Sequence, residues 1–167
     1  MEYQPYYKNY QKLNNEKEKI KMLETKNELA VFESEKDVYC SMPTESIEDR
    51  KLVARALEKS DVLLNDCEGQ SFNLKGFYLE KKMIAELDAK NEPVTDENGV
   101  VKVRPKYRTI LFADDGKTYA SGAYGVYSSI KSMVYVFGNP NTWLKPIPVT
   151  VKKPKLKDGK TSLKLEF

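Results

Sequence analysis

The last hundred residues of the chain place one helical segment among five strand-like segments, and this order limits the fold more than any other feature. Alternating apolar residues with many β-branched and aromatic side chains predict strands, and apolar residues three and four apart predict a helix. The predicted strands cover residues 70–82, 101–114, 117–121, 147–153 and 161–167, and the predicted helix covers residues 125–137. The turn formers Asp114, Asp115 and Gly116 separate the second and third strands.

Three strands, a helix and two strands are the order of elements in the five-stranded Greek-key barrel called the OB-fold. We therefore predict a mainly β protein of the α+β class, with its helix between strands 3 and 4. The outer face and loops of such a barrel commonly bind oligonucleotides. The fold class alone thus favours a nucleic acid as the ligand.

The first predicted strand changes phase at a glycine. Phe72 and Leu74 lie on one face of an ideal strand, whereas Phe77 and Leu79 lie on the other. One extra residue at Gly76 would place all four on the same face, so we predict a β-bulge that bends the strand there. The outer face of this strand then carries Asn73, Lys75 and Tyr78.

The predicted helix carries an apolar stripe that would fill the bottom of the barrel. The stripe consists of Val126, Ile130, Met133, Val134 and Phe137. Gly138 follows directly and predicts the end of the helix, because glycine readily adopts the backbone conformation that stops one.

The chain before the barrel divides into two parts. Residues 1–35 combine a tyrosine-rich arm with a charged helical segment whose apolar stripe is thin. Such a composition predicts that this part is either disordered or packs against another copy. Residues 44–60 predict a better helix, because Ser46 and Asp49 have the spacing of a capping box. We assign residues 1–35 to an N-terminal extension and residues 36–167, with this capped helix, to the OB domain.

The charge of the chain is divided between its two parts. Residues 1–100 carry 15 Lys or Arg and 21 Asp or Glu, whereas residues 101–167 carry 13 Lys or Arg and 4 Asp or Glu. A surface whose charges serve only solubility would mix the signs. The basic C-terminal part therefore indicates a polyanionic partner.

Cationic and aromatic residues interleave on the predicted strands. Binding of a single strand without sequence preference needs cations along the phosphates and flat rings under the bases. The predicted nucleic-acid-binding residues are Lys75, Tyr78, Arg104, Lys106, Tyr107, Arg108, Tyr119, Tyr124, Trp143, Lys152 and Lys153. A strand tyrosine can equally belong to the core, and Trp143 can be either a stacking platform or a lid on the barrel end.

Other chemistry finds little support. The chain has no histidine, which removes the usual general base and with it Ser-His and Cys-His nucleophilic pairs. Cys40 and Cys67 are too few for a disulfide framework or a structural zinc site, and Asp114-Asp115-Gly116 is a turn more readily than a metal site. We expect no enzyme, no cofactor and no metal. With no signal peptide and no apolar run of membrane length, we expect a cytoplasmic protein.

Three segments resemble a known family. They are DDGKTYASGAYGVYSSIKSMVYVFGNPNTW (114–143), the following PIPVTVKK and the closing GKTSLKLEF. They resemble single-stranded DNA-binding proteins of bacteriophages and of conjugative elements in Gram-positive bacteria. The resemblance covers about residues 40–167 and includes the capped helix SMPTESIEDRKLVARAL. It implies an OB barrel that holds single-stranded DNA during replication or transfer, and it assigns no individual ring to a base.

The sequence thus predicts a non-catalytic protein that binds single-stranded DNA largely without sequence preference. RNA is a further possible ligand. The N-terminal extension predicts a homo-oligomer, and we expect no membrane partner. The alternative is an OB-fold factor that uses the same barrel for assembly with another protein. A steep salt dependence of oligonucleotide affinity distinguishes the two, because neutralised phosphates release counterions.

Overall fold

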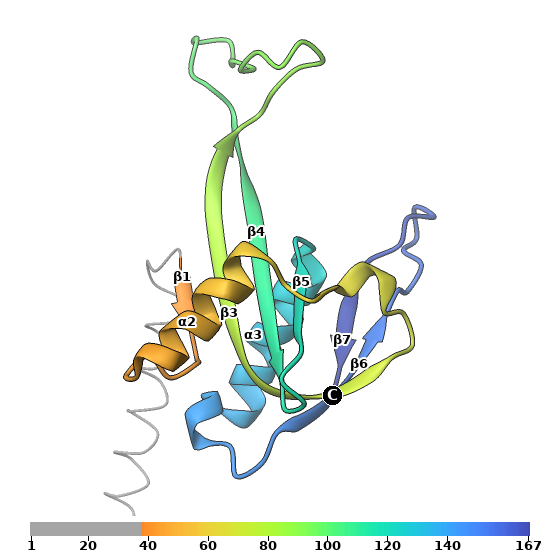
Figure 1. The fold of residues 1–167 in the computed structure, drawn as a ribbon. Helices are drawn as coiled ribbons and strands as arrows, with labels where there is room; N and C mark the ends of the chain where they lie inside the picture. The colour runs from red at the N-terminus through yellow and green to blue at the C-terminus, as the bar shows by residue number, and fades with distance from the viewer. Residues whose placement is uncertain (1–37) are drawn as a thin grey trace, which may run out of the picture. The chain divides into compact units, whose positions relative to one another are not determined.

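The computed structural model describes residues 38–167, and the predicted extension at residues 1–35 lies outside them. In the described part, one curled sheet forms a half-barrel with two α-helices against it (Figure 1). The strands are β1 (Val38–Cys40), β2 (Val62–Leu63), β3 (Ser71–Ala85), β4 (Val103–Ala113), β5 (Thr118–Ser121), β6 (Ile147–Lys152) and β7 (Lys164–Glu166). The helices are α2 (Ile47–Glu58) and α3 (Tyr124–Phe137), with 3-10 turns η1 (Leu64–Asp66) and η2 (Pro140–Thr142). The mainly β, α+β class is confirmed.

The strands are hydrogen-bonded in the order β2-β5-β4-β3-β6-β7, and β1 pairs with β3. Every pairing is antiparallel except that of β2 with β5. The five predicted strands are β3, β4, β5, β6 and β7, and the predicted helix is α3, so these elements are confirmed. The sequence does not predict β1 and β2, because strands of 3 and 2 residues are too short to show an alternation.

The predicted bulge lies in β3, and its extra residue is Lys75. The register with β4 shifts between Leu74 and Gly76, so Leu74 and Phe77 face the same side. Gly76 leaves room for the segment that crosses it, because a Cβ there would lie 2.5 Å from the sulfur of Met42. Ser41 fixes that crossing, since the backbone N–H of Phe77 donates to its hydroxyl at 2.7 Å.

The inner face of the curled sheet holds the main core. Leu74, Phe77 and Leu111 of the sheet are fully buried, as are Val126 and Ile130 of α3. The predicted helix stripe is confirmed at Val126, Ile130, Met133 and Val134, which are all buried. It is wrong at Phe137, which is 44% exposed because it ends the helix beyond the sheet and packs edge-on against Phe167. Gly138 stops the helix, as predicted, at φ 75°.

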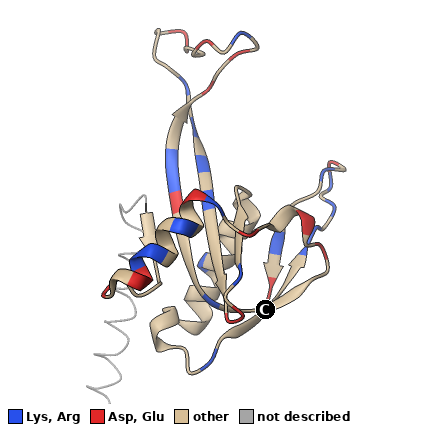
Figure 2. Ribbon diagram, viewed as in Figure 1, with Lys and Arg blue, Asp and Glu red and all other residues tan. Residues whose placement is uncertain are grey.

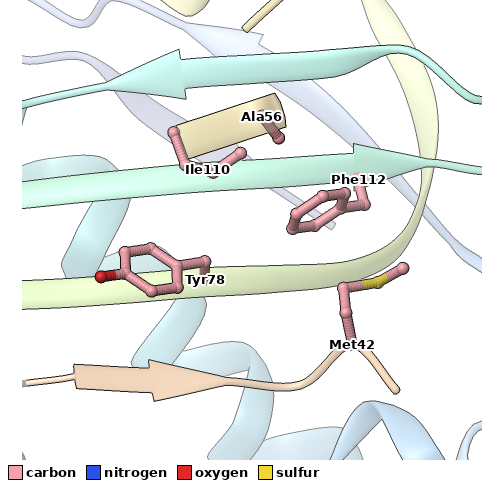
Figure 3. Packing of buried hydrophobic residues seen from close by; sticks show 5 residues of the cluster. All are labelled: Met42, Ala56, Tyr78, Ile110 and Phe112. Carbon is pink, nitrogen blue, oxygen red and sulfur yellow. The ribbon is translucent and has the colours of Figure 1, made fainter. Parts of the chain in front are cut away.

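Helix α2 covers part of the outer face. Met42 and Ala56 pack there against Tyr78 of β3 and against Ile110 and Phe112 of β4 (Figure 3).

The predicted capping box begins this helix. The Ser46 hydroxyl accepts the backbone N–H of Asp49 at 3.0 Å and donates to the Asp49 carboxylate at 2.7 Å. The capping box thus starts α2 next to the stretch of sheet that it covers.

Helix α3 lies along the free edge of β7. The two end strands of the order, β2 and β7, are not paired with each other within residues 38–167, so the curled sheet stays open between them. At Gly125 a Cβ would lie 2.3 Å from the carbonyl oxygen of Leu163, so only glycine permits this close contact. The Ser129 hydroxyl accepts the backbone N–H of Leu165 at 3.1 Å. Helix α3 therefore gives a hydrogen-bond partner to the edge of β7, which a closing strand would otherwise pair.

Strands β3 and β4 continue beyond the rest of the sheet as a long two-stranded arm (Figure 1). Their pairing runs out to Ala85 and Val103. The segment 91–99, which is dense in turn-forming residues, lies at the tip, where the Asp96 carboxylate accepts the backbone N–H groups of Asn98 and Val100. Across residues 38–167, neither helix combines the length and apolar character that crossing a membrane requires.

Candidate nucleic-acid interface

A groove of about 770 Å³ lies beside the open edge of the sheet. Its cationic lining comes from Lys82 of β3, Lys106 and Arg108 of β4, and Lys153 just after β6. The chain at Ser121, where β5 ends, forms another part of the wall. Two strands and a connection thus bring four positive side chains to one hollow, and such a hollow attracts an anionic chain.

The strand alternation explains why these cations share one face. In the register, Tyr78 pairs with Ile110, Glu80 with Arg108, and Lys82 with Lys106. Alternate residues of a strand point to the same side, so the outer face changes from apolar to charged along the two strands. Figure 2 shows the charged stretch where β3 and β4 run past α2.

A single carboxylate lies among the cations. Glu80 is 8% exposed, and the ammonium of Lys82 lies 2.6 Å from one of its carboxylate oxygens. This hydrogen bond, helped by the opposite charge, raises the pKa of Lys82. Lys82 therefore keeps its positive charge in the groove while Glu80 partly offsets it.

Arg108 joins the groove to helix α2. Its guanidinium donates a hydrogen bond to the carbonyl oxygen of Leu57, in the last turn of the helix. A cation at this position also suits the negative end of the helix dipole. Arg108 thus lies at the boundary between the covered and open parts of the outer face.

Three tyrosine rings form a cluster next to the groove. Tyr107 lines the groove, and its ring centroid lies 5.1 Å from that of Tyr124 and 4.8 Å from that of Tyr127. Tyr124 is 61% exposed. Both strand and helix therefore contribute rings to a site that can offer a face to a base.

Two predicted stacking residues are buried instead. Tyr78 lies on the outer face, as predicted, but α2 and Met42 cover it and leave it 8% exposed. Tyr119 is 7% exposed and stacks on Phe72 with ring centroids 4.2 Å apart. Burial is the main cause that raises the pKa of each phenol. These two rings pack in the protein and offer no open face, which corrects the prediction for them.

A second hollow of about 280 Å³ lies at the other end of β3. Lys75 and Trp143 line it together with Lys145. The Trp143 indole N–H donates to the carbonyl oxygen of Gly138 at 3.1 Å, which fixes the ring beside the end of α3. Two predicted residues that are far apart in the sequence thus meet away from the groove.

The remaining predicted residues lie apart from both hollows. Arg104 is exposed on the long arm. Lys152 points to Glu166, with 3.9 Å between the ammonium and a carboxylate oxygen. Of the eleven predicted residues, the groove gathers Lys106, Tyr107, Arg108 and Lys153, with Tyr124 in ring contact.

Sequence reasoning missed Glu80, Lys82 and Lys145. The first two carried a signal, because continuing the alternation from Tyr78 leads to Glu80 and then Lys82. Lys145 follows the exposed Leu144 in an irregular segment, and nothing in its spacing places it near Lys75.

The acidic turn has a structural role. The Asp115 carboxylate accepts the backbone N–H of Lys117 at 3.0 Å, and Asp114 accepts the Asn73 amide at 3.0 Å. Gly116 has φ 84°, a conformation that glycine adopts without strain. In the described part of the chain, no group of three or more His, Cys, Asp or Glu is placed to hold a metal ion. The turn interpretation is confirmed.

One comparison with known proteins gives a match. Residues 32–167 match a family model described as Phage Single-stranded DNA-binding protein. No curated protein and no solved structure matches the chain. The matched residues include all the strands and helices described above.

Proposed function

The chain belongs to the family of phage single-stranded DNA-binding proteins, and from this premise we propose that it coats single-stranded DNA without catalysis. The binding is largely independent of sequence and serves replication or DNA transfer of a phage or mobile element, in the cytoplasm of its host. One observation carries the proposal: four cationic residues line the groove, and the ring cluster of Tyr107 with the exposed Tyr124 lies beside it. Cations for phosphates and rings for bases are what sequence-independent binding requires.

The proposed binding mode divides the groove between two kinds of contact. Lys82, Lys106, Arg108 and Lys153 neutralise phosphates, and Tyr107 with Tyr124 offers faces for bases. Arg104 on the arm extends the cationic path, and Lys152 supports it by charge. The contacts use no paired donors and acceptors directed at base edges, so they do not read sequence.

We also propose that residues 36–167 form an OB-fold domain. The order β5-β4-β3-β6-β7 supports this assignment, because each of these strands has the neighbours expected in a five-stranded Greek-key barrel. The position of α3 between β5 and β6 in the chain agrees with it. The groove lies beside the opening between the end strands β2 and β7.

Binding at two salt concentrations tests the proposed function. Oligo-dT should bind much more tightly than duplex DNA, and RNA of equal length is compared alongside. With four phosphate contacts, log K should fall with log salt at a slope of about −3, since each single-strand contact contributes about 0.7. A weak affinity with a flat salt slope would instead support a protein partner. The exposed side chains of Tyr135, Val136 and Phe137 at the end of α3 favour that second candidate.

A matched pair of variants locates the binding surface. Lys106→Ala with Lys153→Ala should reduce the magnitude of the salt slope by about 1.4, the contribution of two phosphate contacts. Lys51→Ala with Lys117→Ala removes the same charge from exposed positions outside the groove and should leave the slope unchanged. Equal effects from the two pairs would mean that net charge, and not the groove, sets the affinity.

The N-terminal extension is proposed to join neighbouring copies along the strand. Its first ten residues offer Tyr3, Tyr6, Tyr7 and Tyr10 and no large aliphatic side chain except Met1. Tyrosine gives much contact area at low entropic cost, which suits an interface. Deleting residues 1–35 should preserve affinity for a short oligonucleotide and reduce oligomer size on long poly-dT, as light scattering measures. The same oligomeric state with and without the extension would contradict this.

A further inference from the structure

The second hollow has the chemistry of a nucleotide site but lies apart from the groove. Lys75 belongs to β3, and Trp143 and Lys145 follow η2, so three separate backbone positions present two ammonium groups and one ring. Met42 and Pro43 add apolar side chains to its lining. Its volume of about 280 Å³ is small, so it suits a single base more than a length of strand.

The local structure fixes the ring of this hollow and sets the position of Lys75 on the strand. Lys75 is the extra residue of the bulge, which has no partner in the β4 register, and its side chain is exposed. The Trp143 ring is held through its N–H bond to Gly138, and η2 begins at the buried Pro140. A ring fixed before binding loses little conformational entropy when a base stacks on it.

We propose that this hollow is a second subsite for the strand that occupies the groove. One base stacks on Trp143, and Lys75 and Lys145 neutralise the phosphates on either side of it. The inference rests on the proposed function, because it assigns a further part of the same ligand. Lys75 and Lys82 are seven positions apart and the bulge absorbs one of them, so the two sites are separated by about 20 Å along β3.

This separation predicts a dependence on oligonucleotide length. An oligo-dT of about 4 nucleotides is close to the smallest site of an OB-fold, and one of about 16 nucleotides is close to the largest. The short strand occupies the groove alone, because the groove holds more cations, whereas the long strand reaches both sites. Trp143 is the single tryptophan of the chain, so tryptophan emission reports on this hollow alone.

Fluorescence and anisotropy with the full chain test the inference. We expect the 16-nucleotide strand to quench Trp143 at saturation and the 4-nucleotide strand to leave its emission unchanged. Lys75→Ala with Lys145→Ala should weaken binding of the long strand and reduce its salt slope by about 1.4, with the short strand unaffected. This variant retains the indole and its bond to Gly138. Lys51→Ala with Lys117→Ala is the charge-matched control.

The possible results separate the two proposals. Saturated binding of the long strand without any change in Trp143 emission would overturn the second subsite and leave the groove intact. So would equal losses for the short and long strands in the lysine variant. Absence of binding by either strand to the unaltered protein would overturn the proposed function itself.

Discussion

The outer face of β3 and β4 has two halves that differ in what lies above them. In the covered half, Tyr78, Ile110 and Phe112 pack beneath α2 and Met42. In the open half, Lys82 and Lys106 face the groove. The backbone pairing is continuous through both halves, so the difference comes from side chains alone. The proposed binding surface begins where the apolar residues beneath α2 end.

A similar comparison explains why predicted tyrosines differ in burial. Tyr78 and Tyr107 both belong to the long β3–β4 pair, but they point to opposite sides of it, because Tyr107 lies between Lys106 and Arg108 on β4. Tyr78 is enclosed by α2, whereas the Tyr107 ring packs with Tyr124 and Tyr127 of α3 beside the groove. Strand propensity favours tyrosine at either place. The neighbouring helix therefore decides how open each ring is, and the two rings make predictions that separate packing from binding.

The largest effect is expected in the covered half. Tyr78→Ala should lower the free energy of unfolding by about 3–5 kcal/mol, the range for removing a large aromatic side chain from a core. The fraction that stays folded should bind oligo-dT with unchanged affinity, because the ring does not reach the groove. Denaturant unfolding and anisotropy together measure this. Tyr78→Phe keeps the ring and should cost little.

The opposite result would contradict the assignment of Tyr78 to packing. If Tyr78→Ala unfolds normally but loses affinity, the covered half contacts DNA and α2 must move away when it binds.

The second prediction concerns the ring of Tyr107 beside the groove. Tyr107→Ala should weaken oligo-dT binding by about 1–3 kcal/mol if one base stacks there. Tyr135→Ala is the matched control, because Tyr135 is 74% exposed on α3 and lies outside the groove. A loss of thermal stability without a loss of affinity in Tyr107→Ala would assign this ring to packing with Tyr124 and Tyr127.

The elements of the fold were predictable because their signals are local. The alternation in β3 even located the bulge, since Phe72 and Phe77 could share a face only if one residue was extra. The capping box of Ser46 and Asp49 likewise placed the start of α2. Each of these signals lies within a few residues of the backbone feature that it determines.

The site was less predictable because it depends on contacts between distant segments. Nothing near Tyr78 shows that Met42 and Ala56 cover it. The groove likewise needs Lys153 next to the β3–β4 pair, and this follows only from the curl of the sheet. The sequence therefore predicted cations and rings as the types of residue for a binding surface, but it could not separate the buried rings from the open ones.

The third prediction adjusts the charge of the open half without removing a cation. Glu80→Gln should raise affinity for oligo-dT by roughly threefold, because it releases Lys82 and removes a repulsion worth about 0.2–1 kcal/mol. Glu45→Gln is the control, since Glu45 is exposed just before α2 and lies outside the groove. A fall in affinity for Glu80→Gln would show instead that the carboxylate orients Lys82 for binding.

The smallest effect concerns the junction between helix α2, which covers the sheet, and strand β5, which borders the groove. Asp61 follows α2, and its carboxylate accepts both the hydroxyl and the backbone N–H of Thr118 in β5, each at 2.8 Å. The hydroxyl bond is the main cause that lowers the pKa of Asp61. Because the pKa of Asp61 is lower in the folded than in the unfolded protein, the ionised carboxylate stabilises the folded state above the unfolded pKa of about 3.9. This stabilisation is lost as the pH falls through the pKa of the folded state.

Asp61→Asn should therefore cost less than about 1 kcal/mol near neutral pH, because the carboxylate is open to solvent. The difference between the two proteins should shrink below about pH 4, as denaturant unfolding across pH 3–7 measures. A difference that stays constant into acid would mean that Asp61 acts by its shape, and that the boundary between the two halves does not depend on its charge.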